Sequence, residues 1–202
     1  MSEETNWEEH YQSDSGQLPW DIGTPSPELI EYFDTLAQPP FHVLEIGCGT
    51  GTNALWMAEK GCDVLATDIS PTAIEKAKKK PRPVGAKLDF QVSNILEQAP
   101  SGKATVDFVF DRGVYHTMSL EQRPVFIDAV AKILRAGGFW LCLAGCADEE
   151  RKPDEPGPPQ LKVSELVDLA EKQFEIHSID RTHFILPGGI ERLAWKVLYR
   201  RR

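Results

Sequence analysis

The alternation of short apolar runs with helical stretches, which begins at Phe41, restricts the fold of this chain more than any other feature. This pattern is typical of a parallel sheet with helices on both of its faces. The apolar runs predict strands at 41–47, 63–69, 87–93, 106–111 and 138–145, with two more at about 174–184 and 192–200. The helical period predicts helices at 28–36, about 51–60, 71–80, 121–135 and 163–173.

The connection between the last two predicted strands differs from the others. Leu186-Pro187-Gly188-Gly189 reads as a turn and not as a helix, so the final strand is expected to run antiparallel. At 202 residues the chain fits a single domain of ordinary size. We therefore expect one domain over 1–202, with a cap and a helix in 1–36 and an α/β core over 41–202.

A glycine-rich loop follows the first predicted strand, in the sequence Glu45-Ile46-Gly47-Cys48-Gly49-Thr50-Gly51. Glycines let the backbone turn tightly and approach a ligand with no Cβ in the way. The helix that starts there directs its free N–H groups at the carboxyl edge of the sheet, where open α/β folds bind their ligands. Asp68 ends the next strand, where a carboxylate can accept both hydroxyl hydrogens of a ribose. Together these features predict a nucleoside site.

The spacing of the glycines discriminates between nucleotide-binding families. A dinucleotide loop needs a glycine at position 52, which is Thr52, and a P-loop needs a Gly-Lys-Ser/Thr that is absent. The stretch 45–51 closely resembles motif I of the class I S-adenosylmethionine-dependent methyltransferases, and Thr67-Asp68-Ile69-Ser70 resembles their ribose-binding strand end. A nicotinamide enzyme and a non-catalytic relative are the alternatives.

This resemblance implies a Rossmann-like α/β fold, with a seven-stranded, mostly parallel sheet, an antiparallel last strand and helices on both faces. It implies S-adenosylmethionine as cofactor and S-adenosylhomocysteine as product. The cofactor contacts that it implies in the first half of the site come from Glu45, Gly47, Cys48, Gly49, Thr50, Gly51, Asp68 and Ile69.

The resemblance also implies an adenine site after the third strand, at Ser93, Asn94 and Ile95. Asn94 stands where the family usually has Asp, and its amide carbonyl can accept the same hydrogen bond from the adenine amino group. Ile69 and Ile95 are expected to flank the ring. The alternative is that Asn94 only terminates a strand.

Asp111-Arg112-Gly113-Val114-Tyr115-His116 follows the fourth strand, which in this family borders the sulfonium and the methyl acceptor. Asp111 is expected to fix the methionine end of the cofactor or to orient Arg112. Tyr115 and His116 are expected on the acceptor side, where a histidine can take a proton at neutral pH. A surface ion pair of Asp111 with Arg112, and a packed His116, are the alternatives. A base is optional, because aligning a nucleophile with an activated methyl group can supply most of the rate.

The N-terminal segment narrows the resemblance further. Trp7, Tyr11 and 19–25, with Gly157-Pro158-Pro159, resemble the cap of the thiopurine, thiol and halide methyltransferases and of the tellurite-resistance methyltransferases. Trp20 is expected to close over the sulfonium by cation–π contact, whereas Trp7 and Tyr11 could equally be hydrophobic anchors. We therefore expect a methyltransferase for a small molecule, at a thiol or another soft nucleophile. The alternatives are N- or O-methylation of a small molecule, a non-catalytic cofactor-binding subunit and methylation of a protein.

The composition of the chain excludes several other classes of protein. A net charge of −9 opposes sequence-independent binding of nucleic acid, and no apolar run approaches the roughly 20 residues of a membrane span. The acidic N-terminus lacks the features of a signal peptide, so we expect a cytoplasmic protein, as a monomer or weak dimer. The four cysteines form no zinc spacing with the histidines, so free thiols and no metal are expected. A metal or arsenic contact of Cys142 and Cys146 is the alternative.

Overall fold

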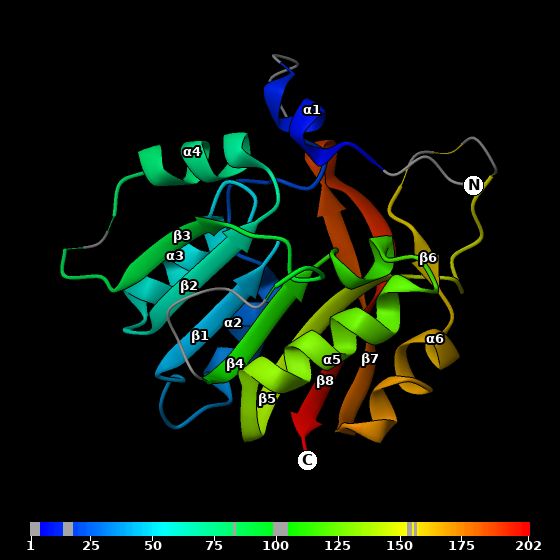
Figure 1. Cartoon of the computed structure of the whole chain (residues 1–202). Coiled ribbons are helices and arrows are strands. Elements are labelled where there is room, and N and C mark those ends of the chain that lie inside the picture. Colours follow the sequence, from blue (N-terminus) through cyan, green and yellow to red (C-terminus); the bar gives the residue numbers. More distant parts are fainter. Residues whose placement is uncertain (1–4, 14–17, 83, 99–104, 153–154, 156) are drawn as a thin grey trace.

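The computed structural model describes residues 5–13, 18–82, 84–98, 105–152, 155 and 157–202. One mixed sheet forms its centre, with the strand order β3-β2-β1-β4-β5-β8-β7 (Figure 1). The strands are β1 (His42–Ile46), β2 (Asp63–Asp68), β3 (Leu88–Val92), β4 (Val106–Arg112), β5 (Leu134–Cys146), β6 (Gln160–Leu161), β7 (Phe174–Leu186) and β8 (Ile190–Arg201). Strands β1 to β5 pair in parallel, while β8 runs antiparallel to both β5 and β7. The expected mixed sheet with an antiparallel last strand is confirmed, with the two-residue β6 added beside β5.

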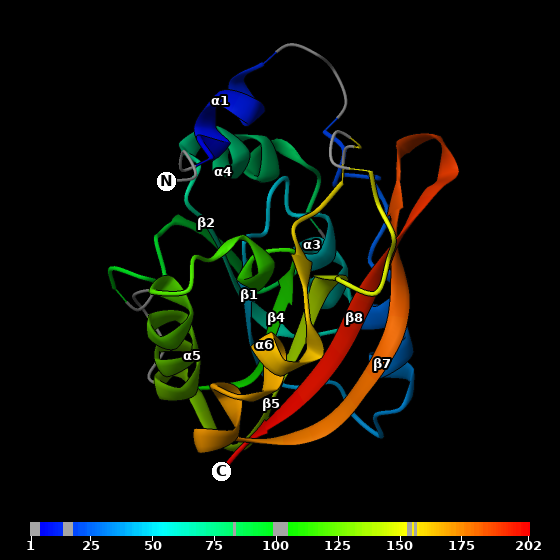
Figure 2. The same cartoon turned by 90° about the vertical axis from the view of Figure 1, so that its right-hand side faces the viewer.

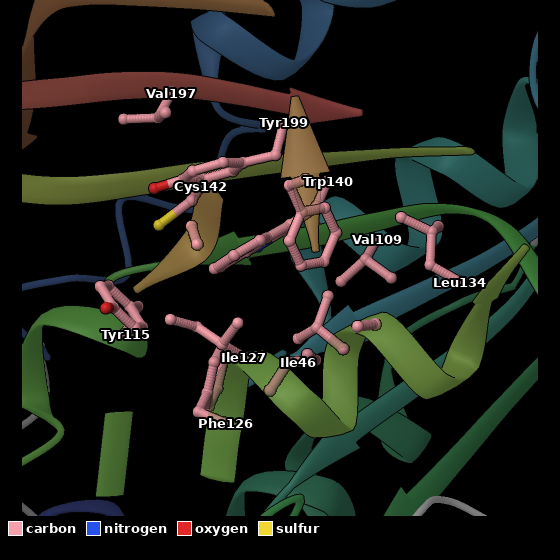
Figure 3. Packing of buried hydrophobic residues seen from close by; sticks show 14 of the residues in the cluster. Ile46, Val109, Tyr115, Phe126, Ile127, Leu134, Trp140, Cys142, Val197 and Tyr199 are labelled. Carbon is pink, nitrogen blue, oxygen red and sulfur yellow. The ribbon is translucent and has the colours of Figure 1, made fainter. Parts of the chain in front are cut away.

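Helices cover both faces of this sheet (Figures 1 and 2). They are α1 (Trp7–Gln12), α2 (Pro27–Asp34), α3 (Thr52–Glu59), α4 (Pro71–Lys79), α5 (Gln122–Ile133) and α6 (Val163–Val167), with 3-10 turns η1 (Tyr115–Thr117), η2 (Ala170–Lys172) and η3 (Pro187–Gly189). Apolar residues of α5 and α6 pack on one face, and those of α2, α3 and α4 pack on the other. Figure 3 shows the first of these cores, where Trp140 and Tyr199 stack with ring centroids 4.4 Å apart.

Two predicted elements differ from the structure. The helix predicted at 163–173 is divided into α6 and η2, because tyrosine hydroxyls from elsewhere in the chain donate to the carbonyls of Glu165 and Leu166. A continuing α-helix would use those carbonyls for its own hydrogen bonds. Strand β5 begins at Leu134, earlier than predicted, and a register irregularity against β4 accompanies this extension.

The short helix α1 lies across the N-terminal end of α4, at the carboxyl edge of the parallel strands (Figures 1 and 2). The carboxylate of Glu8 accepts hydrogen bonds from the Thr72 N–H (3.2 Å), the Thr72 hydroxyl (2.6 Å) and the Ser70 hydroxyl. These bonds lower the pKa of Glu8 to about 2. Lys76 adds a bond from Nζ to the carbonyl of Tyr11 (2.6 Å). The cap is thereby attached next to the strand end that carries Asp68.

Candidate active site

The glycine loop connects β1 to α3 and is held against the end of β2. Asp68 accepts the N–H of Gly49 on Oδ2 (2.9 Å) and the N–H of Ser70 on Oδ1 (2.9 Å). Burial raises the pKa of the Asp68 carboxyl, and these N–H groups act in the opposite direction. Each carboxylate oxygen has a further lone pair for a ligand. The structure thus brings the predicted loop and the predicted ribose-binding carboxylate together.

Gly49 has a φ of +53°, in the left-handed region that favours glycine. A Cβ at this position would lie 2.8 Å from the hydroxyl oxygen of Tyr11 in the cap. The cap therefore packs directly on the backbone of the loop, and a side chain at position 49 would separate them.

Glu45 points from the end of β1 toward the loop and is buried. Its Oε1 accepts a hydrogen bond from Nδ2 of Asn53 (3.1 Å), while its Oε2 is buried and has no hydrogen-bond partner. Burial raises the pKa of this carboxyl to about 8. An unpartnered buried oxygen costs free energy unless a ligand supplies a donor. The ammonium of an amino-acid moiety is a donor of suitable charge, so Glu45 fits the methionine half of S-adenosylmethionine.

A pocket with about 60 Å³ of free volume lies between the glycine loop and the segment that follows the cap helix. Among the described residues it is lined by Trp20, Asp21, Ile22, Thr24, Ser26, Gly47, Cys48, Gly49, Thr50, Thr52, Asn53 and Arg112. That volume holds only a few water molecules, since roughly 10–15 Å³ of it suffices for each. The pocket is therefore small in this conformation, and the segment at Trp20 forms one of its sides.

The segment at Trp20 and Asp21 joins both sides of the pocket. The Thr50 hydroxyl donates to Oδ2 of Asp21 (2.5 Å), which ties the segment to the glycine loop. Arg112 donates from Nη1 to the carbonyl of Trp20 (3.1 Å), which ties it to the end of β4. The indole of Trp20 donates from Nε1 to the Tyr11 hydroxyl (3.0 Å). Trp20 and Arg112, both predicted site residues, thus lie together at the pocket.

Arg112 is enclosed on its other side by the C-terminal hairpin. Its guanidinium carbon lies 4.9 Å from the ring centroid of Phe184 on β7. Burial lowers the pKa of Arg112, whereas the negative charge of Glu28, followed by those of Asp21 and Glu45, raises it. Among the described residues no carboxylate forms an ion pair with Arg112, so its charge is available to a ligand.

Asp111 lies on the opposite face of β4 from Arg112, as the alternation of strand side chains requires. Its Oδ1 accepts the N–H groups of Val114 and Tyr115, both at 3.0 Å, and its Oδ2 accepts Nε1 of Trp140 (3.1 Å). It is fully buried and does not line the pocket. Its contacts shape the loop after β4, and the structure shows none through which it would orient Arg112 directly.

Tyr115, predicted on the acceptor side, does not line the pocket. Its ring lies in the core beside Phe126 and Trp140 (Figure 3), and its hydroxyl donates to the carbonyl of Glu165 (3.0 Å). The backbone N–H bonds to Asp111 turn the chain into η1 immediately after Gly113, which directs Tyr115 inward. These contacts favour a packing role for Tyr115 over the predicted catalytic one.

His116 is buried beside Phe184, with ring centroids 5.9 Å apart. Its Nδ1 accepts the N–H of Gly145 (2.9 Å), so the proton of the neutral imidazole lies on Nε2. Burial, together with the charges of Arg112 and Arg151, lowers the pKa of His116 to about 3. These contacts favour the packed histidine over a base.

The predicted adenine side lies at the ends of β2 and β3. Ile69 is 47% exposed and the neighbouring Val92 is 52% exposed, which leaves an apolar surface beside Asp68. Asn94 uses its carbonyl to accept the N–H of Leu96 (3.0 Å) and its amide to donate to Glu97 (3.0 Å). These local bonds stabilise a turn shortly after the end of β3, and the adenine contact of Asn94 stays a prediction.

The two residues that flank Asn94 differ from the predicted picture of the adenine site. Ile95 is buried in the core, whereas the Oγ of Ser93 is buried without a hydrogen-bond partner. Of the apolar walls expected for adenine, Ile69 is open to a ligand in this conformation.

Several residues of the site were not predicted from the sequence. Asn53 was detectable, because it faces Glu45 from the first turn of a helix whose start the glycine motif marks. In the sequence, Glu28 cannot be distinguished from an exposed charged residue on a surface helix, yet the structure shows that it is buried. Thr182 and Phe184 of β7 carry no sequence signal for this site. A Cβ at Gly51 would lie 2.7 Å from Phe90, so that glycine serves packing.

Comparison with known proteins identifies the family. The model of the thiopurine S-methyltransferase family matches residues 2–199. The chain belongs to this family. It is 31% identical to a probable thiol methyltransferase of Arabidopsis thaliana, over 97% of the chain and 87% of that protein. It is 28% identical to a 2-heptyl-1-hydroxyquinolin-4(1H)-one methyltransferase of Mycobacteroides abscessus, over 87% of the chain and 79% of that protein.

A solved structure related to conversion of a disulfide bond into a thioacetal group during echinomycin biosynthesis superposes with a TM-score of 0.81. It is 27% identical and covers 96% of this chain and 90% of its own. These relatives confirm the predicted fold, the enzyme class and S-adenosylmethionine as the cofactor of this methyltransferase. Among the described residues, no helix has the length and apolar character needed to cross a membrane, and no cluster of His, Cys, Asp or Glu could hold a metal ion.

Proposed function

We propose that this protein transfers the methyl group of S-adenosylmethionine to a small thiol or a similarly soft nucleophile, at a site between the glycine loop and Arg112. The observation that carries the proposal is the pocket between the glycine loop and the segment at Trp20, which is lined by the guanidinium-bearing Arg112 and by Asn53. Asn53 binds the carboxylate of Glu45, whose second oxygen is buried without a partner. The name of the Arabidopsis relative supports a thiol acceptor.

In the proposed complex, Glu45 accepts hydrogen bonds from the ammonium of the cofactor and Asp68 accepts those of its ribose. Ile69 provides the apolar wall for adenine. The cofactor, when bound, supplies a methyl group that is already activated on a sulfonium. The protein therefore has to align a nucleophile with that group and exclude water. The cap at Tyr11 and Trp20 performs the exclusion.

Arg112 acts on the acceptor in this proposal. A thiol with an ordinary pKa of about 8.5 is a poor nucleophile until it ionises. A guanidinium without a carboxylate partner favours the thiolate, because opposite charge nearby stabilises the ionised form. We therefore assign to Arg112 the binding of the acceptor as its thiolate; the thiol releases its proton to the solvent as it binds, so no side chain has to accept it.

The proposal is tested by calorimetric titration with S-adenosylmethionine, S-adenosylhomocysteine and NAD, followed by a screen of thiol, amine and phenol acceptors for release of S-adenosylhomocysteine. Binding of both adenosyl compounds with release from thiols is the expected result. Release from amines or phenols alone would replace it by N- or O-methylation; the Mycobacteroides relative is named for a hydroxyquinolinone, a substrate without sulfur. Binding without release from any acceptor would indicate a non-catalytic subunit.

The state of His116 separates thiol methylation from a mechanism that needs a base. Asn at this position can accept the N–H of Gly145 as Nδ1 does, but it cannot take a proton at neutral pH. We expect His116→Asn to retain thiol methylation within about threefold, whereas loss of a general base costs roughly 100- to 10,000-fold. The measurement is kcat for a thiol acceptor from pH 6 to 9. A loss of a hundredfold with unchanged cofactor affinity would restore His116 as the base.

We further propose that the protein is cytoplasmic and a monomer or weak dimer, and that it binds no nucleic acid. The net charge of −9 supports the last of these, because it repels the phosphates of DNA and RNA. Light scattering at two protein concentrations measures the oligomeric state, and a stable dimer at both would contradict the second.

A further inference from the structure

Glu28, on helix α2, is a buried carboxylate with two hydroxyl partners. Its Oε2 accepts the hydroxyl of Ser26 (2.5 Å) and its Oε1 accepts the hydroxyl of Thr182 on β7 (2.6 Å). Among the described residues no basic side chain forms an ion pair with it. Both oxygens of Glu28 thus accept hydrogen bonds from neutral hydroxyl groups, which fix the carboxyl group between α2 and β7.

Strand β7 connects this carboxylate to Arg112. Thr182 and Phe184 are two residues apart, so their side chains lie on the same face of the strand, about 7 Å apart. Thr182 binds Glu28, and the ring of Phe184 lies 4.9 Å from the guanidinium carbon of Arg112. Glu28 and Arg112 therefore occupy neighbouring positions on one side of β7. Of the acidic residues that raise the pKa of Arg112, Glu28 has the largest effect.

We propose that Glu28 is a fixed counter-charge to Arg112 that limits the attraction of the acceptor site for anions. This inference rests on the proposed function, in which Arg112 faces the methyl acceptor. With Glu28 in place, part of the positive potential of Arg112 is offset, so an acceptor that carries a second negative charge gains less from this site than it would without Glu28. The acceptor is then a thiol that carries no additional anionic group, and Glu28 is a residue that determines specificity without touching the acceptor.

The test compares two acceptors that differ by one charge, mercaptoacetate and mercaptoacetamide. Their S-methylated products are titrated calorimetrically into the complex with S-adenosylhomocysteine, and kcat/KM is measured for the thiols themselves. In Glu28→Gln we expect affinity and kcat/KM for the carboxylate to rise roughly three- to tenfold relative to the amide. The values for the amide should change less than about twofold, because a neutral group does not respond to the lost charge.

Two matched variants accompany this change. Glu31→Gln removes the same charge from the same helix, but the Glu31 side chain is 65% exposed and pairs with Lys196 (2.8 Å). The ratio of the values for the carboxylate and the amide should therefore stay unchanged in this variant. Glu28→Asp keeps the charge and should stay close to the wild-type ratio. If Glu28→Gln does not fold, Thr182→Val serves instead. It removes the hydroxyl that holds Oε1 of Glu28 at β7, so the carboxylate is no longer fixed next to Arg112 and the ratio should shift in the same direction.

An unchanged ratio in a Glu28→Gln protein that binds S-adenosylhomocysteine normally would overturn the inference. An equal shift in Glu31→Gln would also overturn it, because the effect would then be one of net charge. Failure of the proposed function gives a different result. In that case the wild type methylates neither thiol, while the binding ratio of the two products still responds to Glu28. Absence of binding by both products in every variant would remove Arg112 from the acceptor site, and the inference with it.

Discussion

Replacing Gly49 by Asp should abolish binding of S-adenosylmethionine and S-adenosylhomocysteine, with a loss of affinity of roughly 100-fold or more. Gly49 lies at φ +53°, and its N–H bonds to the carboxylate of Asp68 at 2.9 Å. An added side chain enters the space in which the cap and the ligand meet the loop, and its charge repels Asp68 across a buried site. Both effects act on the ligand site, so the calorimetric signal of either adenosyl compound should disappear.

Gly61→Asp is the matched control for this variant. Gly61 follows α3 and has a φ of +91°, and a Cβ added there would have no atom within 4 Å. Asp at either position adopts a left-handed conformation that costs about 1–2 kcal/mol. Both variants should therefore lose stability in thermal denaturation, Gly49→Asp by more because its side chain also meets Tyr11, and only Gly49→Asp should lose the cofactor. Wild-type affinity in Gly49→Asp would place the cofactor elsewhere.

The second large effect is expected for Glu45→Gln, and it depends on pH. The pKa of Glu45 is raised to about 8 by burial, from an ordinary value of 4.5. The stability associated with protonated Glu45 is therefore complete below pH 4.5 and is lost as the pH rises through 8. Gln does not ionise. The difference in melting temperature, variant minus wild type, should therefore increase as the pH rises from 5 to 9. In the free energy of unfolding, this relative stabilisation of the variant amounts to at most about 5 kcal/mol.

The same variant should bind S-adenosylmethionine roughly 10- to 100-fold more weakly, because a neutral amide replaces the charged acceptor of the ammonium. Wild-type protein must lose a proton from Glu45 to bind that ammonium at pH 7. Titrations in two buffers with different ionisation enthalpies should therefore reveal proton release in the wild type and none in Glu45→Gln.

Glu59→Gln, at the exposed end of α3, is the control and should leave affinity, proton release and the pH dependence unchanged. Equal proton release by the wild type and Glu45→Gln would show that Glu45 does not receive the ammonium.

Residues next to a strand end could be predicted, because their position depends on local pattern. The glycine loop and Asp68 adjoin apolar strands whose parallel pairing brings them to one edge, and the structure places them in contact. Tyr115 and His116 could not be placed in this way. A 3-10 turn follows Gly113, and strand alternation does not predict which side chains it turns inward.

The contribution of β7 side chains to the site could not be predicted, for a different reason. Thr182 and Phe184 reach the site through the pairing of β7 with β8 and of β8 with β5, and nothing local in their sequence indicates that register. Glu28 was missed because its burial depends on that same hairpin.

The hydrogen bond between Glu28 and Thr182 joins residues 154 positions apart. During synthesis the N-terminal helices leave the ribosome long before the hairpin exists, since translation proceeds at about 5–20 residues per second. For that interval of several seconds or more, the nascent chain carries the glycine loop and Arg112 but lacks the strand that encloses the guanidinium. If Arg112 binds the acceptor as proposed, a chain that stops before β7 would lack the Phe184 side of that site, and methylation would begin only after the last strands have been made and paired.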